Sequence, residues 1–355
     1  MSTTQRNKKI YINESVFGYI MKEALYYEKL EKNKVHCLLC PQNCVIEDGK
    51  RGFCRVRENK AGKLYSLVYA TPCSTAIDPI EKKPLFHFLP GTLSYSLGTA
   101  GCNLRCQFCQ NWEISQARPE DVYSVEYSPE EIVKNAIDNN CKSIAYTYTE
   151  PTIFYEYVLD CAKLARKKGL KNIMVTSGFI NQEPLKKLYK YIDAANIDLK
   201  SFSDDYYKKI CAGRLQPVLD AIKSIKEMGV WFELTTLIVP TLNDSDEEIT
   251  KLCEWIKNEL GQDTVLHFSR FFPCWKLGQL PPTSEETLMR AKKIADKYLN
   301  YVYIGNIHIE NTEDTFCPKC KTDNIIRSGF TIIQNKSSKG KCFKCSHEIP
   351  GVWKA

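Results

Sequence analysis

Short apolar runs recur along the middle of the chain, and more polar segments with a different periodicity separate them. Each run spans five to nine residues, which suits a buried strand better than a buried helix. The pattern predicts strands at 93–98, 143–148, 172–176, 194–199, 231–239, 265–271 and 301–307.

The segments between these runs carry the start signals of amphipathic helices. Ser128-Pro129-Glu130-Glu131 is a capping box with proline at the first helical position. A second box begins at Ser245, ahead of apolar residues that share one helical face, and a third runs from Thr283 to Glu286.

Strands that alternate with helices predict a parallel sheet with right-handed crossovers. The chain supplies about six such β/α units, fewer than the eight of a closed TIM barrel. We therefore expect an α/β fold whose main domain, residues 91–315, is a partial, open β/α TIM-like barrel.

Both ends of the chain depart from this pattern. Residues 14–30 have the periodicity of one amphipathic helix, a cysteine-rich segment follows at 37–54, and a connector runs to about residue 90. After about residue 315 the chain is polar and cysteine-bearing, without a helical period. We divide it into an N-terminal part (1–90), the barrel (91–315) and a C-terminal tail (316–355).

Charge and composition narrow the functional classes. The net charge is +7, but lysine and arginine are interleaved with acidic residues, which indicates solvated helix faces and not a nucleic-acid-binding stripe. The first residues contain no apolar signal region, and no apolar run is long enough to cross a bilayer. We expect a cytoplasmic protein with no nucleic-acid or membrane partner.

Cysteine is the most informative residue type. The chain has 17 cysteines, and eleven of them fall into three tight clusters. Without an export signal, this density indicates metal or redox chemistry and not disulfides. Cys161 and Cys253 lie on the apolar faces of predicted helices, where we expect small buried hydrophobic side chains.

Cys102, Cys106 and Cys109 form the central cluster, with the spacing C-x3-C-x2-C directly after the first barrel strand. This loop lies at the carboxyl end of the sheet, where α/β folds place their chemistry. Three thiolates can hold three irons of a 4Fe–4S cluster and leave the fourth iron open to a small molecule, whereas an electron-transfer cluster takes four cysteines. A zinc site is the alternative, but no neighbouring histidine or cysteine supplies a fourth ligand.

This loop resembles that of radical S-adenosylmethionine (SAM) enzymes, and Gln110-Asn111 resembles the branch that contains pyruvate formate-lyase activating enzymes. Across nearly the whole chain the sequence resembles AmmeMemoRadiSam-system radical SAM enzymes. The stretches that carry the resemblance are CLLCPQNCVIEDGKRGFCRVR, YTYTEPTIFYEY, NIDLKSF, the RFFP region and a zinc-ribbon tail.

The resemblance implies that SAM binds the open iron and is cleaved to a 5′-deoxyadenosyl radical, which abstracts hydrogen from a substrate. Phe108 matches an aromatic residue that packs near adenine. Tyr148, Thr149 and Glu150 stand where the superfamily has Gly-Gly-Glu, a segment that binds the SAM amino group. The alternative for Glu150-Pro151 is an ordinary helix start.

Three further segments are candidate SAM contacts. Asp198 and Lys200 share one face of their strand with Asn196; Lys200 would pair with the SAM carboxylate, and a structural salt bridge is the alternative. Thr176 and Ser177 resemble a Thr-Asn-Gly turn, with Ser in place of Asn and Val175 in place of an acid. Related enzymes place a histidine where this chain has Phe272, so Arg270 or His267 would supply that contact, or it is missing.

The two outer cysteine clusters have the spacing of metal sites. Cys37, Cys40, Cys44 and Cys54 fit either structural zinc or an auxiliary 4Fe–4S cluster, and we expect zinc because nothing nearby demands further electron transfer. Cys317, Cys320, Cys342 and Cys345 form paired C-x2-C knuckles that predict a zinc ribbon, with His347 as a weaker alternative ligand.

The functional expectation is a radical SAM enzyme with a 4Fe–4S cluster, SAM and zinc as cofactors and flavodoxin or ferredoxin as electron donor. The resemblance implies Memo-like and AMMECR-type partner proteins and a peptide or protein substrate. The alternatives are a glycyl-radical enzyme activase and a non-catalytic zinc-ribbon adaptor.

Overall fold

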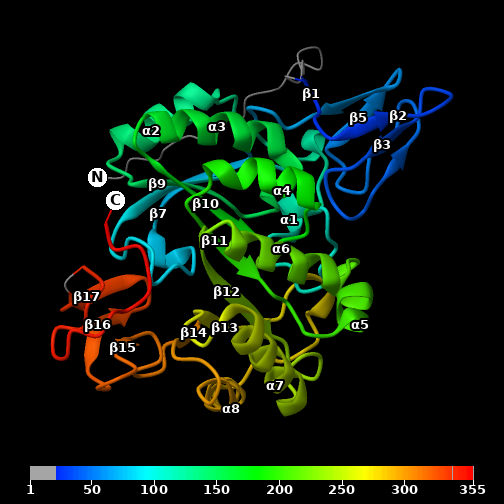
Figure 1. Cartoon of the computed structure of the whole chain (residues 1–355). Coiled ribbons are helices and arrows are strands. Elements are labelled where there is room, and N and C mark those ends of the chain that lie inside the picture. Colours follow the sequence, from blue (N-terminus) through cyan, green and yellow to red (C-terminus); the bar gives the residue numbers. More distant parts are fainter. Residues whose placement is uncertain (1–20, 338, 355) are drawn as a thin grey trace, which may run out of the picture.

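The computed structural model describes residues 21–337 and 339–354 (Figure 1). One eight-stranded sheet dominates it, with the strand order β14-β13-β12-β11-β10-β9-β8-β7. Strands β8 to β14 are parallel, and β7 pairs antiparallel with β8 at the edge. The strands are β7 (Ser74–Pro79), β8 (Leu93–Gly98), β9 (Ser143–Tyr146), β10 (Lys171–Thr176), β11 (Ala194–Asp198), β12 (Trp231–Ile238), β13 (Leu266–Arg270) and β14 (Val302–Gly305).

Helices connect the parallel strands and cover the outer face of the sheet (Figure 1). Those of seven or more residues are α2 (Pro129–Asp138), α3 (Tyr155–Lys167), α4 (Gln182–Leu188), α6 (Leu215–Glu227), α7 (Asp246–Trp255) and α8 (Glu285–Ala295). Short α1 (Trp112–Ser115) and α5 (Asp204–Tyr206) join them, and π-helical segments follow α5 (Tyr207–Cys211) and α7 (Ile256–Leu260). Short 3₁₀ helices lie at Ile80–Lys82, Pro119–Asp121, Pro151–Phe154, Tyr189–Tyr191 and Trp275–Leu277.

This architecture confirms the predicted α/β fold. All seven predicted strands are present, with ends that differ by at most two residues, and the sheet remains open between β14 and β7. All four residues of β9 are buried, as expected for a parallel strand that is covered on both faces.

Two of the three predicted helix starts are confirmed, and the third shifts by one residue. Ser128 makes the reciprocal capping box with Glu131, and Ser245 accepts from the backbone N–H of Glu248. At α8 the cap is Ser284, not Thr283. Thr283 is buried, and its hydroxyl donates to the carbonyl of Ile238.

The predicted helix over 14–30 is wrong for its described part. Residues 14–20 lie outside the described residues, and the rest forms β1 (Lys22–Glu23) and β2 (Tyr27–Lys29). These strands join two small antiparallel sheets with β3 (Val35–Cys37), β4 (Val45–Ile46), β5 (Arg57–Lys60) and β6 (Lys63–Ser66). Strand pairing within this cysteine-bearing module overrides the local helical pattern.

Residues 74–79 belong to the barrel sheet as β7, although our division placed them in the N-terminal part. The sheet therefore begins before the predicted boundary at residue 91. The edge position agrees with Pro79, which has no N–H to donate to a neighbouring strand.

The C-terminal module is a three-stranded sheet of β15 (Thr315–Phe316), β16 (Asp323–Ser328) and β17 (Thr331–Asn335). It docks on the barrel on the side away from the N-terminal sheets (Figure 1). The buried side chain of Arg327 donates to the carbonyl of Phe86, and Phe88 forms a parallel bridge with Val352.

Among the described helices, none combines the length and the apolar character needed to cross a membrane.

Candidate active site

A cavity of about 550 Å³ opens at the carboxyl ends of the parallel strands. Its volume lies within the range of small-molecule binding pockets. Residues from the cysteine loop, from the ends of β9 to β13 and from the C-terminal module line it. Of the predicted site residues, Cys102, Cys106, Phe108, Cys109, Tyr148, Thr149, Glu150, Thr176, Ser177, Asp198 and Lys200 all line this cavity.

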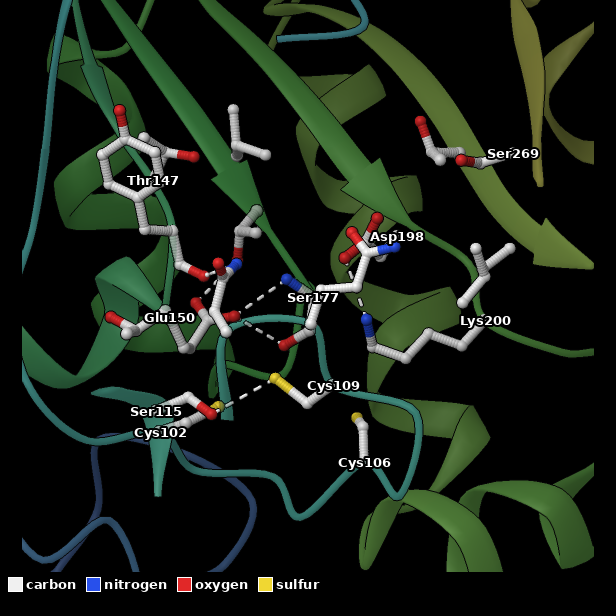
Figure 2. A pocket seen from close by; sticks show the side chains of 18 of the residues that line it. Cys102, Cys106, Cys109, Ser115, Thr147, Glu150, Ser177, Asp198, Lys200 and Ser269 are labelled. Carbon is white, nitrogen blue, oxygen red and sulfur yellow. Dashed lines mark hydrogen bonds and ion pairs between the residues drawn. The ribbon is translucent and has the colours of Figure 1, made fainter. Parts of the chain in front are cut away.

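The cysteine loop is held by backbone and side-chain hydrogen bonds. The Leu104 N–H donates to Cys102 Sγ at 3.4 Å, and Cys109 Sγ lies 3.2 Å from Ser115 Oγ (Figure 2). Asn111 Nδ2 donates to the carbonyl of Tyr148 at 2.8 Å and ties the end of the loop to the segment after β9. The three thiols therefore face the cavity from one fixed loop.

The sulfur spacing suits a cluster better than a single ion. Four sulfurs bound to one zinc at about 2.3 Å would stand about 3.8 Å apart. The three loop sulfurs are not all within 4.8 Å of one another, and no fourth cysteine is among the described residues that line the cavity. This donor set would hold three irons of a 4Fe–4S cluster and leave the fourth iron without a protein ligand.

The surroundings of the Cys102 and Cys106 thiols raise their pKa values and so disfavour the thiolate form. Burial raises the pKa of Cys102 well above its usual value, and the nearby Glu150 carboxylate raises it further. The neighbouring Cys211 thiol and burial raise the pKa of Cys106. These buried sulfurs could hold iron as thiolates, because a bound cation would supply the charge that keeps them deprotonated.

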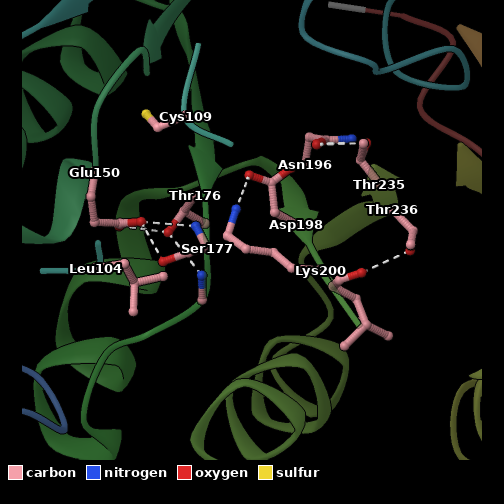
Figure 3. Close-up of polar contacts among 12 residues, drawn as sticks. Leu104, Cys109, Glu150, Thr176, Ser177, Asn196, Asp198, Lys200, Thr235 and Thr236 are labelled. Carbon is pink, nitrogen blue, oxygen red and sulfur yellow. Dashed lines mark hydrogen bonds and ion pairs between the residues drawn. The ribbon is translucent and has the colours of Figure 1, made fainter. Parts of the chain in front are cut away.

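Glu150 is the most heavily bonded side chain of the site. It is buried and accepts five hydrogen bonds, two from Thr152, one from the Thr176 hydroxyl at 2.7 Å, and two from Ser177, whose N–H donates at 2.8 Å (Figure 3). It also caps the 3₁₀ helix that begins at Pro151, so the helix-start alternative is part of its role. A carboxylate offers about four lone-pair sites, so these contacts saturate it.

Asp198 and Lys200 form an ion pair at the end of β11, with 2.8 Å between Lys200 Nζ and Asp198 Oδ2 (Figures 2 and 3). Burial alone would lower the pKa of Lys200, but Asp198 and the Cys106 and Cys211 thiols raise it well above its usual value. The ammonium lies 5.9 Å from the centroid of the Phe108 ring. It is therefore a fixed positive charge beside the cysteine loop.

Tyr148 has a backbone conformation that non-glycine residues seldom adopt, with φ of 69°. Its hydroxyl donates to Asp78 Oδ2 at 3.0 Å, and Asp78 also pairs with Lys83 at 2.6 Å. Strained backbone of this kind concentrates at functional sites. Next to it, the Thr149 hydroxyl donates to the carbonyl of Thr99 at 2.9 Å.

Three residues from the sequence analysis lie outside this cavity. Arg270 donates to the carbonyl of Thr283 and lies over the Phe272 ring, and Ser269 lines the cavity instead. His267 is 2.7 Å from Glu233 Oε2 in the barrel interior. Asn196 lies two residues before Asp198 on the same face of β11, where it donates to the carbonyl of Pro84 and accepts from the Thr235 hydroxyl (Figure 3).

Several lining residues were missed by sequence reasoning. Lys82 and Lys83 come from the segment interpreted as a connector, and Ser115 lies on α1. Asn306 and Phe330 come from beyond the last barrel helix, and Phe330 lies in the turn between β16 and β17. No local motif signals these positions, because they reach the site through tertiary packing.

The C-terminal cysteine cluster can hold a metal ion. The sulfurs of Cys317, Cys320, Cys342 and Cys345 all lie within 4.8 Å of one another, and two of their pairs are 3.6 Å apart. This is close to the spacing around one tetrahedral ion of zinc size.

The chain is similar in sequence to several known proteins. The sequence model of the radical SAM superfamily matches residues 96–256. An uncharacterized protein of Methanocaldococcus jannaschii is 48% identical over 332 residues, which cover 93% of this chain and 99% of that protein. A pyruvate formate-lyase-activating enzyme of Clostridium pasteurianum is 29% identical over 167 residues, which cover 44% of this chain and 67% of that enzyme.

Among solved structures, Streptococcus suis SuiB bound to S-adenosylmethionine superimposes with a TM-score of 0.48 and 16% identity. The superposition covers 68% of this chain and 56% of that one. The superfamily match begins in β8, includes the cysteine loop and the segments of Glu150, Ser177 and Lys200, and ends beyond α7. On the basis of the superfamily model and the sequence relatives, the chain belongs to the radical SAM superfamily and is homologous to pyruvate formate-lyase-activating enzymes.

Proposed function

We propose that this chain binds a 4Fe–4S cluster through Cys102, Cys106 and Cys109 and abstracts hydrogen from a peptide or protein substrate. When bound, the cluster and SAM supply one-electron reductive cleavage of the sulfonium, which yields a 5′-deoxyadenosyl radical. The observation that carries the proposal is the set of three thiols, too widely spaced for one tetrahedral ion, that face a cavity of about 550 Å³.

Each polar group of the cavity has a role in this proposal. Lys200, held by Asp198, is the charge partner for the SAM carboxylate. Glu150 is a positioning residue, since its own bonds saturate it, and it fixes the turn at Thr176 and Ser177. Backbone carbonyls near Tyr148 and Thr149 remain as acceptors for the SAM amino group, and Phe108 is the apolar surface for adenine.

The substrate has a separate place to bind. A second cavity of about 420 Å³ adjoins the first, and the two share Lys82, Thr235, Ser269, Asn306 and Phe330. Its lining combines aromatic residues such as Phe86 and Phe330 with ionisable ones such as Glu313, a mixture that suits a segment of a peptide. We propose that a peptide or protein enters here, in a system that includes Memo-like and AMMECR-type proteins, with flavodoxin or ferredoxin as electron donor.

A glycyl-radical enzyme activase is the second candidate, favoured by the homology to the pyruvate formate-lyase-activating enzyme. In that case the substrate would be a backbone glycine of a partner enzyme. A partner protein labelled with α-deuterated glycine would transfer deuterium to 5′-deoxyadenosine. Transfer from another labelled residue type would exclude this candidate.

The C-terminal cysteine set is proposed to hold zinc, because its four sulfurs have the spacing of one tetrahedral ion. We propose that it is structural. A structural zinc site has four protein ligands and no open position for a reactant.

The test is anaerobic reconstitution with iron and sulfide, followed by incubation with SAM and dithionite. Wild type should form 5′-deoxyadenosine, and a Cys102→Ala/Cys106→Ala/Cys109→Ala variant should form none. A Cys141→Ala variant is the matched control, since this isolated cysteine lies just before β9 at the opposite end of the strand. If wild type takes up no iron in the loop, the proposal fails and the zinc-ribbon adaptor replaces it.

A further inference from the structure

The four N-terminal cysteines surround a cavity at the junction of the N-terminal module and the barrel. Cys37 ends β3, Cys40 and Cys44 lie in the turn before β4, and Cys54 precedes β5. All four line the same cavity, together with Ile153 of the barrel. The cluster is therefore a shaped site and not a set of unrelated thiols.

The spacing of these sulfurs differs from that of the C-terminal set in the same structure. No three of the four N-terminal sulfurs lie within 4.8 Å of one another, whereas all four C-terminal sulfurs do. The cavity between them also admits a water-sized sphere. Around one zinc ion, sulfurs about 3.8 Å apart would touch and leave no such space.

A 4Fe–4S cluster explains both features. Its four cysteine ligands bind four different irons, so the thiolates stand farther apart than around one ion, and the inorganic core fills the space between them. We infer that Cys37, Cys40, Cys44 and Cys54 bind a second 4Fe–4S cluster with four protein ligands, in place of the zinc that the sequence favoured.

Polar groups for such a cluster are already in position. The N–H of Phe53 donates to Cys44 Sγ at 3.4 Å. Arg57 lines the cavity and is 1% exposed; its terminal nitrogens bind Glu156 and the carbonyl of Leu25. Its Nε has no partner among the described residues, so it remains as a buried donor for a cluster sulfur.

The N-terminal cysteine site lies next to the cysteine loop of Cys102, Cys106 and Cys109. Gln42 donates to the carbonyl of Asn103 at 3.0 Å, and Arg105 donates to the carbonyl of Phe53 and lies over its ring. A Cβ added at Gly101 would approach the carbonyl oxygen of Cys54 to 2.6 Å. The two cysteine sets are thus joined by contacts of neighbouring residues, although each faces its own cavity.

The metal content of the full chain tests the inference. After anaerobic reconstitution, wild type should hold about eight irons per chain, and the Cys141→Ala control should match it. The Cys102→Ala/Cys106→Ala/Cys109→Ala variant should keep about four irons, with the Mössbauer spectrum of a 4Fe–4S cluster. Cys37→Ser/Cys40→Ser should likewise keep about four irons, now in the catalytic loop.

The triple-alanine variant decides the question even if Cys37→Ser/Cys40→Ser fails to fold. Should it hold no iron and about two zinc ions, the inference is overturned and the N-terminal site is a zinc site. Failure of the proposed function would give a different result, because the triple-alanine variant would then hold as much iron as wild type.

Discussion

At the scale of single residues, Glu150 couples the segment after β9 to the turn after β10. It receives five hydrogen bonds, including one from the backbone N–H of Ser177, which cannot rotate away. The site could be predicted only in part at this scale. Motif spacing identifies the three cysteines, but the pairing of Asp78 with Lys83 and Tyr148 joins residues far apart in sequence.

We predict that Glu150→Gln destabilises the protein and weakens SAM binding. The amide offers one acceptor oxygen in place of two, so a buried donor of Thr176 or Ser177 loses its partner, at a cost of about 1–3 kcal/mol. Urea unfolding and SAM titration measure the two effects. Exposed Glu130→Gln on α2 is the control, and equal stability of the two variants would contradict the prediction.

At the scale of elements, helix starts and buried strands follow local rules, which is why the barrel could be predicted. Ser128 caps α2 by its own side chain, and β8 to β14 are short apolar runs. Elements that depend on partners far away in the sequence could not be predicted from local rules. Lys22 and Glu23 pair with Ser66 and Tyr65, and β7 is a half-exposed edge strand without a continuous apolar run.

The connection from β8 to the cysteine loop depends on Gly101, and we predict that Gly101→Ala lowers iron uptake. Gly101 has φ of +89°, and a Cβ there would lie 2.6 Å from both the carbonyl oxygen of Cys54 and the side chain of Val56. Gly169 is a matched control, since it has φ of +80° and nothing within 4 Å of an added Cβ.

Both substitutions should cost about 1 kcal/mol of backbone strain. Gly101→Ala should cost more and displace the cysteine loop, which iron analysis of the reconstituted protein would detect. If the two variants bind the same amount of iron, the close contact at Gly101 has no role in holding the loop.

At the scale of the whole molecule, the C-terminal module packs against the barrel and lines part of its cavity. Phe330 reaches the active-site cavity, and Arg327 lies 4.3 Å from the centroid of the Phe86 ring.

We predict that Cys317→Ser/Cys320→Ser removes about one zinc per chain and lowers the melting temperature of the whole protein. Unchanged zinc content, relative to Cys141→Ala, would contradict this.

The same contact between barrel and C-terminal module predicts acid sensitivity. His87 Nδ1 lies 2.7 Å from the carbonyl oxygen of Pro350 and must donate to it, so Nε2 accepts from the Tyr303 hydroxyl at 2.7 Å. Burial lowers the pKa of His87 to about 4, against about 6.5 for an exposed histidine. Protonation would place a second donor against Tyr303 and a charge in the core.

Because the unfolded chain binds this proton more readily than the native one, stability falls as the pH drops through this interval. His87 should account for about 2 kcal/mol of the loss between pH 7 and pH 5. His87→Gln replaces the imidazole with an amide, which can donate and accept hydrogen bonds but does not titrate. The free energy of unfolding of this variant should therefore decline less over that range. Glu233 and His267, which pack nearby, are present in both proteins, so the two pH profiles differ only by the substitution at residue 87. Parallel pH profiles from urea unfolding would show that His87 does not hold the module in its neutral form.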